Sequence, residues 1–254
     1  MYARREILKS LGAVPLATIL ASPELAKAAA STLENQTLKL DNGKSVSAAL
    51  ALPDGGPAPA VMLIHEWWGL NDQIKSVAAE FAKSGYVALA VDLYSGNVAT
   101  DPEGARKYMQ ATDAKEATET LQKWNGWLRG HQATTNHLGT VGWCFGGGWS
   151  LNASIASPVD ATVVYYGNVT RSPEELVKLQ GPVQGHFATQ DKWINQEMVD
   201  GFVANMKKAG QKDPEVYWYE ADHAFANPSG GRYDQEDAQL SWQRTQAFLK
   251  THLG

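Results

Sequence analysis

The sequence predicts an α/β fold in which a mainly parallel central sheet is covered by helices on both faces. Residues 60–64 are apolar throughout and residues 161–166 are apolar except for Thr162, as expected of strands that are buried on both faces. Segments with apolar residues at helical spacing separate these runs. Strands that alternate with helices along a chain are typical of parallel sheets.

The first half of the chain contains three strand signals and three helix signals. Residues 31–37 are expected to form a short polar leader, and residues 46–52 an edge strand that ends in the turn cluster at 53–56. A buried strand at 60–64 is followed by an amphipathic helix at 71–84, with Gly85 as its C-cap. Another buried strand at 86–91 precedes two polar helices, at 102–111 and 113–128.

The second half continues the alternation. A short strand at 138–141 leads straight into Gly142, and a helix is expected from Gly146 onward. Then follow buried strands at 161–166 and 183–188, an amphipathic helix at 196–208, a strand at 215–219 and a terminal helix at 234–249. Because sites in such sheets lie at the carboxyl ends of the strands, the residues after each strand are the candidates for function.

Composition favours one soluble domain that acts on small molecules. The chain has 254 residues, of which 44% are hydrophobic and 19% charged, so it can bury a full core without disulfides or structural metal. We expect residues 29–254 to form a single domain. The net charge of -5 leaves no basic surplus to neutralise phosphates, which argues against a nucleic-acid partner.

The N-terminus resembles an export signal. Arg4 and Arg5 precede an apolar run at 11–20, and Ala26-Lys27-Ala28 is a small-x-small pattern that a signal peptidase accepts. The paired arginines resemble the twin-arginine type, with an ordinary secretory signal or a retained anchor helix as alternatives. The run is short for a bilayer core of ~30 Å. We therefore expect residues 1–28 to be removed and the mature protein to be periplasmic, without stable membrane association.

Cys144 is the only cysteine, and its surroundings predict a nucleophile. It lies in Gly142-Trp143-Cys144-Phe145-Gly146, between a strand and a helix. In a G-x-nucleophile-x-G turn, glycines are required where side chains would collide with the neighbouring strand and helix. The N–H of Phe145 would point at a developing oxyanion, and the helix dipole would favour a thiolate. The alternatives are an inert buried cysteine and a phosphate loop, but Walker A spacing is absent.

Asp191 and His223 are the candidate partners of Cys144. A cysteine thiol ordinarily has a pKa of ~8.5, so a nucleophilic cysteine gains from a base. Asp191 and His223 follow the ends of two strands, in the chain order nucleophile, acid, histidine. Asp222 is the alternative acid, but as the neighbour of His223 it would have difficulty reaching around to the ring. His186 lies inside a strand pattern and is expected in the core.

A second cluster, His65-Glu66-Trp67-Trp68, follows the strand at 60–64. In folds that carry a G-x-nucleophile-x-G turn, the loop after the first central strand supplies a second N–H group to the oxyanion. We assign that N–H group to Trp67. A carboxylate at Glu66 could accept the thiol proton or orient the cysteine, the alternative being a bond to a loop amide. A His-Glu pair also suggests metal, but the spacing of a zinc site is missing, so no metal is expected.

Together these residues resemble the dienelactone hydrolase family over nearly the whole mature chain. The matching segments are His65-Glu66-x-x-Gly69-Leu70-Asn71, Asp92-Leu93-Tyr94, Gly142-x-Cys144-x-Gly146-Gly147, Tyr165-Tyr166-Gly167, Asp191 and His223-Ala224-Phe225. The resemblance implies a single α/β-hydrolase domain with a Cys-His-Asp triad, in which the glutamate matching Glu66 helps to generate the thiolate. It also implies carboxymethylenebutenolidase-like hydrolysis of an ester or lactone through an acyl-cysteine, without cofactor.

The chain departs from this family at the residues that bind the substrate carboxylate. The family's arginines correspond to the Ser95-Gly96 pair and to Asn227, which cannot replace a bidentate guanidinium. Arg232 or Arg106 could reach in from elsewhere. The candidate substrate-binding residues are aromatic and predict a preference for apolar or aromatic groups: Trp68, Tyr94, Trp193 and Phe225.

The leading hypothesis is therefore a monomeric, thiol-dependent esterase or lactonase with a small-molecule substrate. The rival from another class is a binding protein that kept the fold and lost turnover. Redox chemistry at Cys144 ranks last because the chain contains no resolving cysteine.

Overall fold

The computed structural model describes residues 22–254. The chain divides between Asn136 and His137 into two compact units, unit 1 and unit 2. The prediction that residues 29–254 form one domain stays a prediction. None of the helices among the described residues is long and apolar enough to cross a membrane.

Most of the predicted export signal lies outside the described residues. Its last part belongs to helix α3 (Pro23–Ala30), which has Ser22 as its N-cap. This helix packs against α4 (Asp72–Lys83), and the Ser76 hydroxyl donates a 2.8 Å hydrogen bond to the Ala26 carbonyl. The signal, its twin-arginine type, its removal near Ala29 and the periplasmic location stay predictions.

Unit 1 contains four strands in the order β1-β2-β4-β3, with β3 and β4 parallel and the other pairs antiparallel. The strands are β1 (Glu34–Lys39), β2 (Ser45–Ala51), β3 (Ala58–Ile64) and β4 (Val87–Val91). Helix α4 packs against β2, β3 and β4 and buries the apolar face that its sequence predicted. The polar helices are α5 (Pro102–Ala111) and α6 (Ala114–Gly130), close to the predicted bounds.

The expectation that residues 46–52 form an edge strand is wrong. β2 pairs with β1 on one side, where Leu50 faces Glu34, and with β4 on the other, where Ala48 faces Val91. The outer strand is β1, which overlaps the segment predicted as a polar leader. Every residue of β1 is exposed or half-buried, so the strand carries no apolar run to reveal it.

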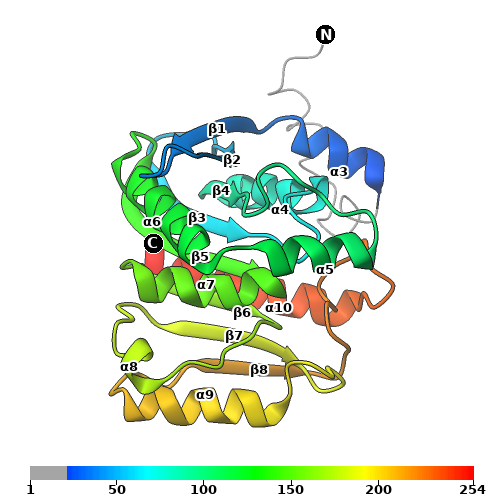
Figure 1. Cartoon of the computed structure of the whole chain (residues 1–254), viewed down its shortest axis with the longest axis vertical. Coiled ribbons are helices and arrows are strands. Elements are labelled where there is room, and N and C mark those ends of the chain that lie inside the picture. The colour runs from blue at the N-terminus through cyan, green and yellow to red at the C-terminus, as the bar shows by residue number, and fades with distance from the viewer. Residues whose placement is uncertain (1–21) are drawn as a thin grey trace. The chain divides into compact units, whose positions relative to one another are not determined.

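Unit 2 contains parallel strands in the order β5-β6-β7-β8, with helices on both faces (Figure 1). The strands are β5 (Thr134–Trp143), whose first residues up to Asn136 belong to unit 1, β6 (Ala161–Tyr165), β7 (Val183–Ala188) and β8 (Glu215–Tyr219). The helices are α7 (Phe145–Ala156), α8 (Pro173–Leu176), α9 (Gln196–Lys208) and α10 (Gln235–Leu253). The short α8 was not predicted. The mainly parallel arrangement is confirmed.

The two faces of the unit 2 sheet carry different interiors. On one face, Val164 and Phe187 pack with α7, α8 and α9 in an apolar cluster. Side chains alternate along a strand, so Tyr165 and His186 point to the opposite face, where both contact Thr245 of α10. The predicted helices on both faces are thus confirmed in this unit.

An aromatic ladder crosses all four strands of unit 2 on the α10 face. Its members, Trp143, Tyr165, His186 and Tyr217, are successive register partners. Their ring centres are 5.5, 4.4 and 5.7 Å apart, with planes inclined by 27°, 28° and 19°. The Arg244 guanidinium lies 4.2 Å from the Tyr217 ring centre and ends the stack. Stacked pairs of this kind stabilise a sheet and fix its register.

His186 is a core residue, as its place in a strand predicted. Its ring is fully buried and lies 2.8 Å from the Tyr219 hydroxyl, 2.9 Å from the Gln184 side-chain oxygen and 3.0 Å from the Thr245 hydroxyl. Burial, with a contribution from the charge of Arg244, lowers the pKa of His186 to about 3. The ring is therefore neutral at physiological pH.

Candidate active site

Cys144 occupies a sharp turn between β5 and α7. Its backbone angles, φ 55° and ψ -116°, lie in a region that residues with a side chain rarely adopt. Hydrogen bonds on both sides hold the turn: the Cys144 N–H donates to the Tyr165 carbonyl at 3.0 Å, and the Cys144 carbonyl accepts from the Gly147 N–H at 3.0 Å. Such backbone strain costs of order 1–3 kcal/mol, which the contacts of the surrounding structure must offset.

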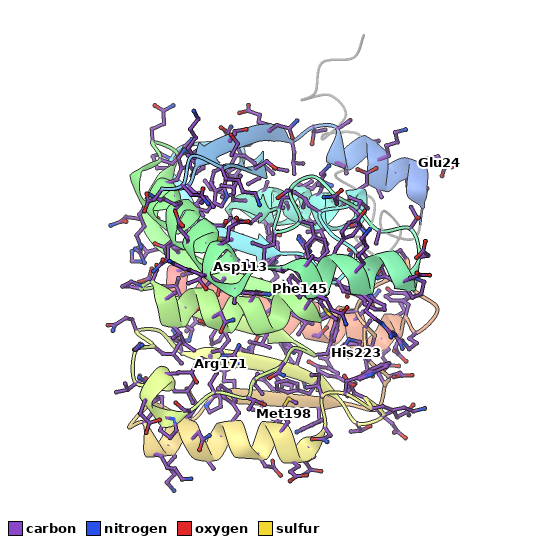
Figure 2. All side chains as sticks on the ribbon, viewed as in Figure 1. Glu24, Asp113, Phe145, Arg171, Met198 and His223 are labelled. Carbon is purple, nitrogen blue, oxygen red and sulfur yellow. The ribbon has the colours of Figure 1, made fainter. Side chains whose placement is uncertain are left out.

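Two glycines at this turn are required by close backbone contacts, and the first of them, Gly142, is one of the pair that the turn motif predicted. A Cβ at Gly142 would collide with the carbonyl of Gly146. A Cβ at Gly147 would lie 2.6 Å from the Tyr165 carbonyl oxygen. Strand, turn and helix can therefore pack this closely only without side chains at these positions. Cys144 is half-buried and directly precedes Phe145, the first residue of α7. Figure 2 labels Phe145 on this helix.

The loops after β7 and β8 bring Asp191 and His223 together. The Asp191 Oδ2 atom lies 2.6 Å from Nδ1 of His223, and both residues are 7% exposed. The other oxygen, Oδ1, accepts the N–H groups of Trp193 at 2.8 Å and Ile194 at 3.1 Å, so the carboxylate is held from both ends. Asp222, the alternative acid, accepts the backbone N–H of His223 at 2.6 Å.

The ring of His223 also interacts with Cys144, which completes a hydrogen-bonded series from Asp191 to the thiol. Burial disfavours a charged ring, but hydrogen bonds and electrostatic interactions with Asp191 and Cys144 outweigh it, so the pKa of His223 is raised to about 10. Burial opposes the charge of Asp191 as well, yet hydrogen bonds and the charge of His223 hold its pKa below the usual value. At neutral pH this arrangement favours an imidazolium beside a carboxylate.

Two aromatic side chains contact the His223 ring of the triad, and a third packs against one of them. Tyr166 and Trp193 each place a ring centre 5.2 Å from that of His223, with interplanar angles of 59° and 75°. Tyr166 is fully buried and has a positive φ of 35°, whereas Trp193 is 58% exposed. Phe225 lies 5.4 Å from the Tyr166 ring and is fully buried. Its predicted contact with substrate stays a prediction, and in the structure it supports Tyr166.

Sequence patterns did not assign a role to Tyr166 or to the contact of Arg232 with Trp193. The signal for Tyr166 was its place as the last residue of the buried strand predicted at 161–166, in front of Gly167. The Arg232 guanidinium lies 5.4 Å from the centre of the Trp193 ring. No local pattern around Arg232 indicates that contact, because the loop that carries it must first fold.

The remaining candidate residues belong to unit 1. His65 is fully buried; its Nδ1 lies 2.6 Å from the Glu66 carbonyl, and its Nε2 accepts the Leu93 N–H at 3.2 Å. Burial lowers the pKa of His65, so a neutral ring with its proton on Nδ1 can satisfy both bonds. His65 thus ties the loop after β3 to the loop after β4, and it holds the backbone of Glu66, whose side chain is 2% exposed.

Two loops of unit 1 hold the other predicted residues. Trp67 and Trp68 are half-buried, with ring centres 5.0 Å apart. The Asp92 carboxylate accepts the N–H groups of Tyr94, at 2.8 Å, and of Gly96, and so closes a tight turn. Tyr94 lines a cavity of about 310 Å³ in this unit. The roles of Glu66, Trp67, Trp68 and Tyr94 stay predictions.

Comparisons with known proteins agree with this geometry. The model of the "Dienelactone hydrolase family" matches residues 46–253. A carboxymethylenebutenolidase of Pseudomonas putida is 27% identical, covering 85% of this chain and 95% of its own. A Bradyrhizobium protein named "Probable 2-oxo-3-(5-oxofuran-2-ylidene)propanoate lactonase" is 31% identical, covering 84% and 92%. A Klebsiella pneumoniae crystal structure named "Putative Dienelactone Hydrolase" is 25% identical with a TM-score of 0.76, covering 86% and 98%.

Proposed function

The chain belongs to the dienelactone hydrolase family, and from that premise we propose that it hydrolyses a small ester or lactone through an acyl-cysteine intermediate on Cys144. Membership makes it an α/β-hydrolase that acts on ester bonds. The observation that carries the finer proposal is the hydrogen-bonded series from Asp191 through His223 to Cys144.

In the first half of the reaction, the Cys144 sulfur attacks the carbonyl carbon of the ester. The carbonyl electrons move to oxygen and form a tetrahedral oxyanion, which the N–H groups of Phe145 and Trp67 are proposed to stabilise. The attacking sulfur is a thiolate, and when the oxyanion collapses the carbon–oxygen bond to the alkoxide breaks. Because its pKa is about 10, the His223 ring holds a proton at neutral pH and gives it to the departing alkoxide. The products of this half are a thioester on Cys144, a neutral His223 and an alcohol.

In the second half, water takes the place of the alcohol. Neutral His223 accepts a proton from water as the water oxygen attacks the thioester carbon. The new oxyanion collapses, breaks the carbon–sulfur bond and releases a carboxylic acid. The thiolate and the imidazolium are thereby restored, while Asp191 keeps the ring oriented through Nδ1.

Glu66 is proposed to assist in forming the thiolate, as the family resemblance implies. Its near-complete burial on the loop after β3 agrees with a specific role rather than a solvated surface position. The substrate is proposed to be a small ester or lactone with apolar or aromatic groups, because aromatic side chains dominate the candidate binding residues and the family's arginine positions hold Gly96 and Asn227.

The test is turnover of p-nitrophenyl acetate by purified protein. We expect Cys144→Ala and His223→Ala each to lower the rate at least about a thousandfold, because the triad acts as one unit. His137→Ala, which alters an exposed histidine at the start of β5, should keep the wild-type rate. A Glu66→Gln variant should show a pH–rate profile different from wild type.

Wild-type rates in both triad variants would show that the assignment is wrong. An unchanged profile for Glu66→Gln would remove that residue from the mechanism. If the wild-type protein turns over no ester and Cys144 reacts with iodoacetamide like an ordinary thiol, the chain is instead a binding protein that kept the fold.

A further inference from the structure

Trp193 is the solvent-side neighbour of the His223 ring. Tyr166, which also contacts that ring, is fully buried and cannot move without disturbing the core. The backbone of Trp193 is anchored, since its N–H donates to Asp191 at 2.8 Å, but the side chain is 58% exposed. Its position beside His223 therefore depends on what it contacts on its outer side.

Arg232 provides that outer contact. Its guanidinium carbon lies 5.4 Å from the centre of the Trp193 ring, within the range of a cation–π interaction. The indole thus has contacts with two residues, the His223 ring and the Arg232 guanidinium, both of which can carry positive charge. Aromatic rings interact favourably with cations, so both neighbours favour this placement of the indole.

A folded loop carries Arg232 to this place. The side-chain oxygen of Asn227 accepts the N–H of Ser229 at 3.0 Å and its hydroxyl at 2.6 Å. The Gly230 N–H donates to the Asn227 carbonyl at 3.0 Å, and the Asp234 N–H closes the loop on the Phe225 carbonyl at 3.0 Å. Asn227 is 4% exposed, so this residue organises the loop from within.

We propose that the Trp193 indole is a wall that limits the size of the groups reaching Cys144 and His223, and that Arg232 is a positioning residue that acts only through Trp193. If the wall selects which esters enter the site, that selection rests on the proposed function. The effect of the wall on access of other reagents to the Cys144 thiol does not rest on the proposed function.

Access can be measured without any ester, because Cys144 is the only cysteine in the chain. The probes are N-ethylmaleimide and the bulkier N-benzylmaleimide, and the readout is the ratio of their alkylation rates. We expect Trp193→Ala to raise the relative rate of the bulky reagent about tenfold. Arg232→Ala should raise it about two- to fivefold, the worth of an exposed cation–π contact. Arg232→Lys should fall between Arg232→Ala and wild type, because an ammonium lacks the planar stacking group.

The double variant decides whether Arg232 acts through the indole. If it does, Arg232→Ala adds nothing to Trp193→Ala, and the double variant has the ratio of the single Trp193→Ala variant. Lys192→Ala removes the same charge from the loop that carries Trp193 and should leave the ratio unchanged. Melting temperatures near wild type would show that each variant is folded.

Two results would overturn the proposal. An unchanged ratio in Trp193→Ala would show that the indole is no wall. An effect of Arg232→Ala that persists in the Trp193→Ala background would show that Arg232 acts independently. A parallel comparison of kcat/KM for p-nitrophenyl hexanoate and acetate extends the test to turnover. Absence of ester turnover would sink the proposed function but leave the alkylation result standing.

Discussion

The His223 ring is the point where burial and hydrogen bonding oppose each other most directly. Burial alone would make the ring neutral, as it does for His186 and His65 in this chain. Asp191 and Cys144 reverse the outcome and raise the pKa of His223 to about 10. The same residue type is therefore a neutral core group at two positions and a proton carrier at the third, because only His223 has negatively charged partners strong enough to outweigh burial.

Asp191→Asn should lower the pKa of His223, because it removes the main hydrogen bond that raises it. The NMR titration of the ring should then have its midpoint below the wild-type value of about 10. Ester turnover should fall by about two orders of magnitude or more. Asp222→Asn is the matched control, since Asp222 bonds the backbone N–H of His223, and it should change the midpoint far less.

The same variant has a predicted effect on stability. The folded-state pKa of His223 lies above the unfolded value near 6.5, so its contribution to the free energy of unfolding is complete below pH 6.5 and is lost as pH rises through about 10. Urea unfolding should show a steeper loss of stability between pH 7 and 10 in wild type than in Asp191→Asn. Equal slopes would contradict this origin of the shift.

The order of Cys144, Asp191 and His223 could be predicted from sequence because each residue follows a strand or flanks a glycine turn. Local patterns reveal strand ends, and the fold brings strand ends together. The roles of Tyr166 and Arg232 could not be predicted from sequence because they depend on rings that meet across loops. The raised pKa of His223 could not be predicted because it results from competing contributions of burial and of hydrogen-bond partners in three dimensions.

At the scale of elements, β5, the turn at Cys144 and α7 form one tightly packed strand–turn–helix motif. Buried strands such as β7 and long amphipathic helices such as α9 have the bounds that their sequence patterns predicted. Their buried positions hold apolar residues, which gives a recognisable pattern in the sequence. β1 and α8 were missed because a half-exposed outer strand and a single helical turn produce almost no apolar pattern.

Gly142→Ala tests the packing of the strand–turn–helix motif around Cys144. The added methyl group would meet the carbonyl of Gly146, so the turn must shift. We expect Tm to fall by roughly 2–12 °C, the effect of overpacking in a domain of this size, and turnover to fall with the displacement of Cys144.

The control is Gly201→Ala in α9, where a Cβ meets nothing within 4 Å. Alanine is favoured over glycine inside a helix, so this change should raise Tm by roughly 1–4 °C. A similar response of Tm in both variants would argue against a special packing requirement at Gly142.

At the scale of the whole molecule, buried neutral histidines make stability depend on acidity. The pKa of His186 is about 3 in the folded chain, well below the unfolded value near 6.5. Below pH 6.5 the unfolded chain binds a proton that the folded chain refuses, so the free energy of unfolding falls as pH drops from 6.5 toward 3. The lowered pKa of His65 acts in the same direction.

His186→Gln should therefore lose less stability between pH 6.5 and 4.5 than wild type, although it is less stable at neutral pH because the aromatic ladder is interrupted. Urea midpoints across this pH range provide the measurement. His137→Gln, at an exposed position, should keep the wild-type slope. Parallel curves for wild type and His186→Gln would exclude His186 as the source.

The folded loop at Asn227 has a consequence for how this site can change in sequence. Because the asparagine oxygen holds the turn through Ser229, an arginine at position 227 would remove both bonds and loosen the loop that carries Arg232. The three residues therefore depend on one another, and we expect Asn227, Ser229 and Arg232 to be kept or replaced together among proteins that share this loop.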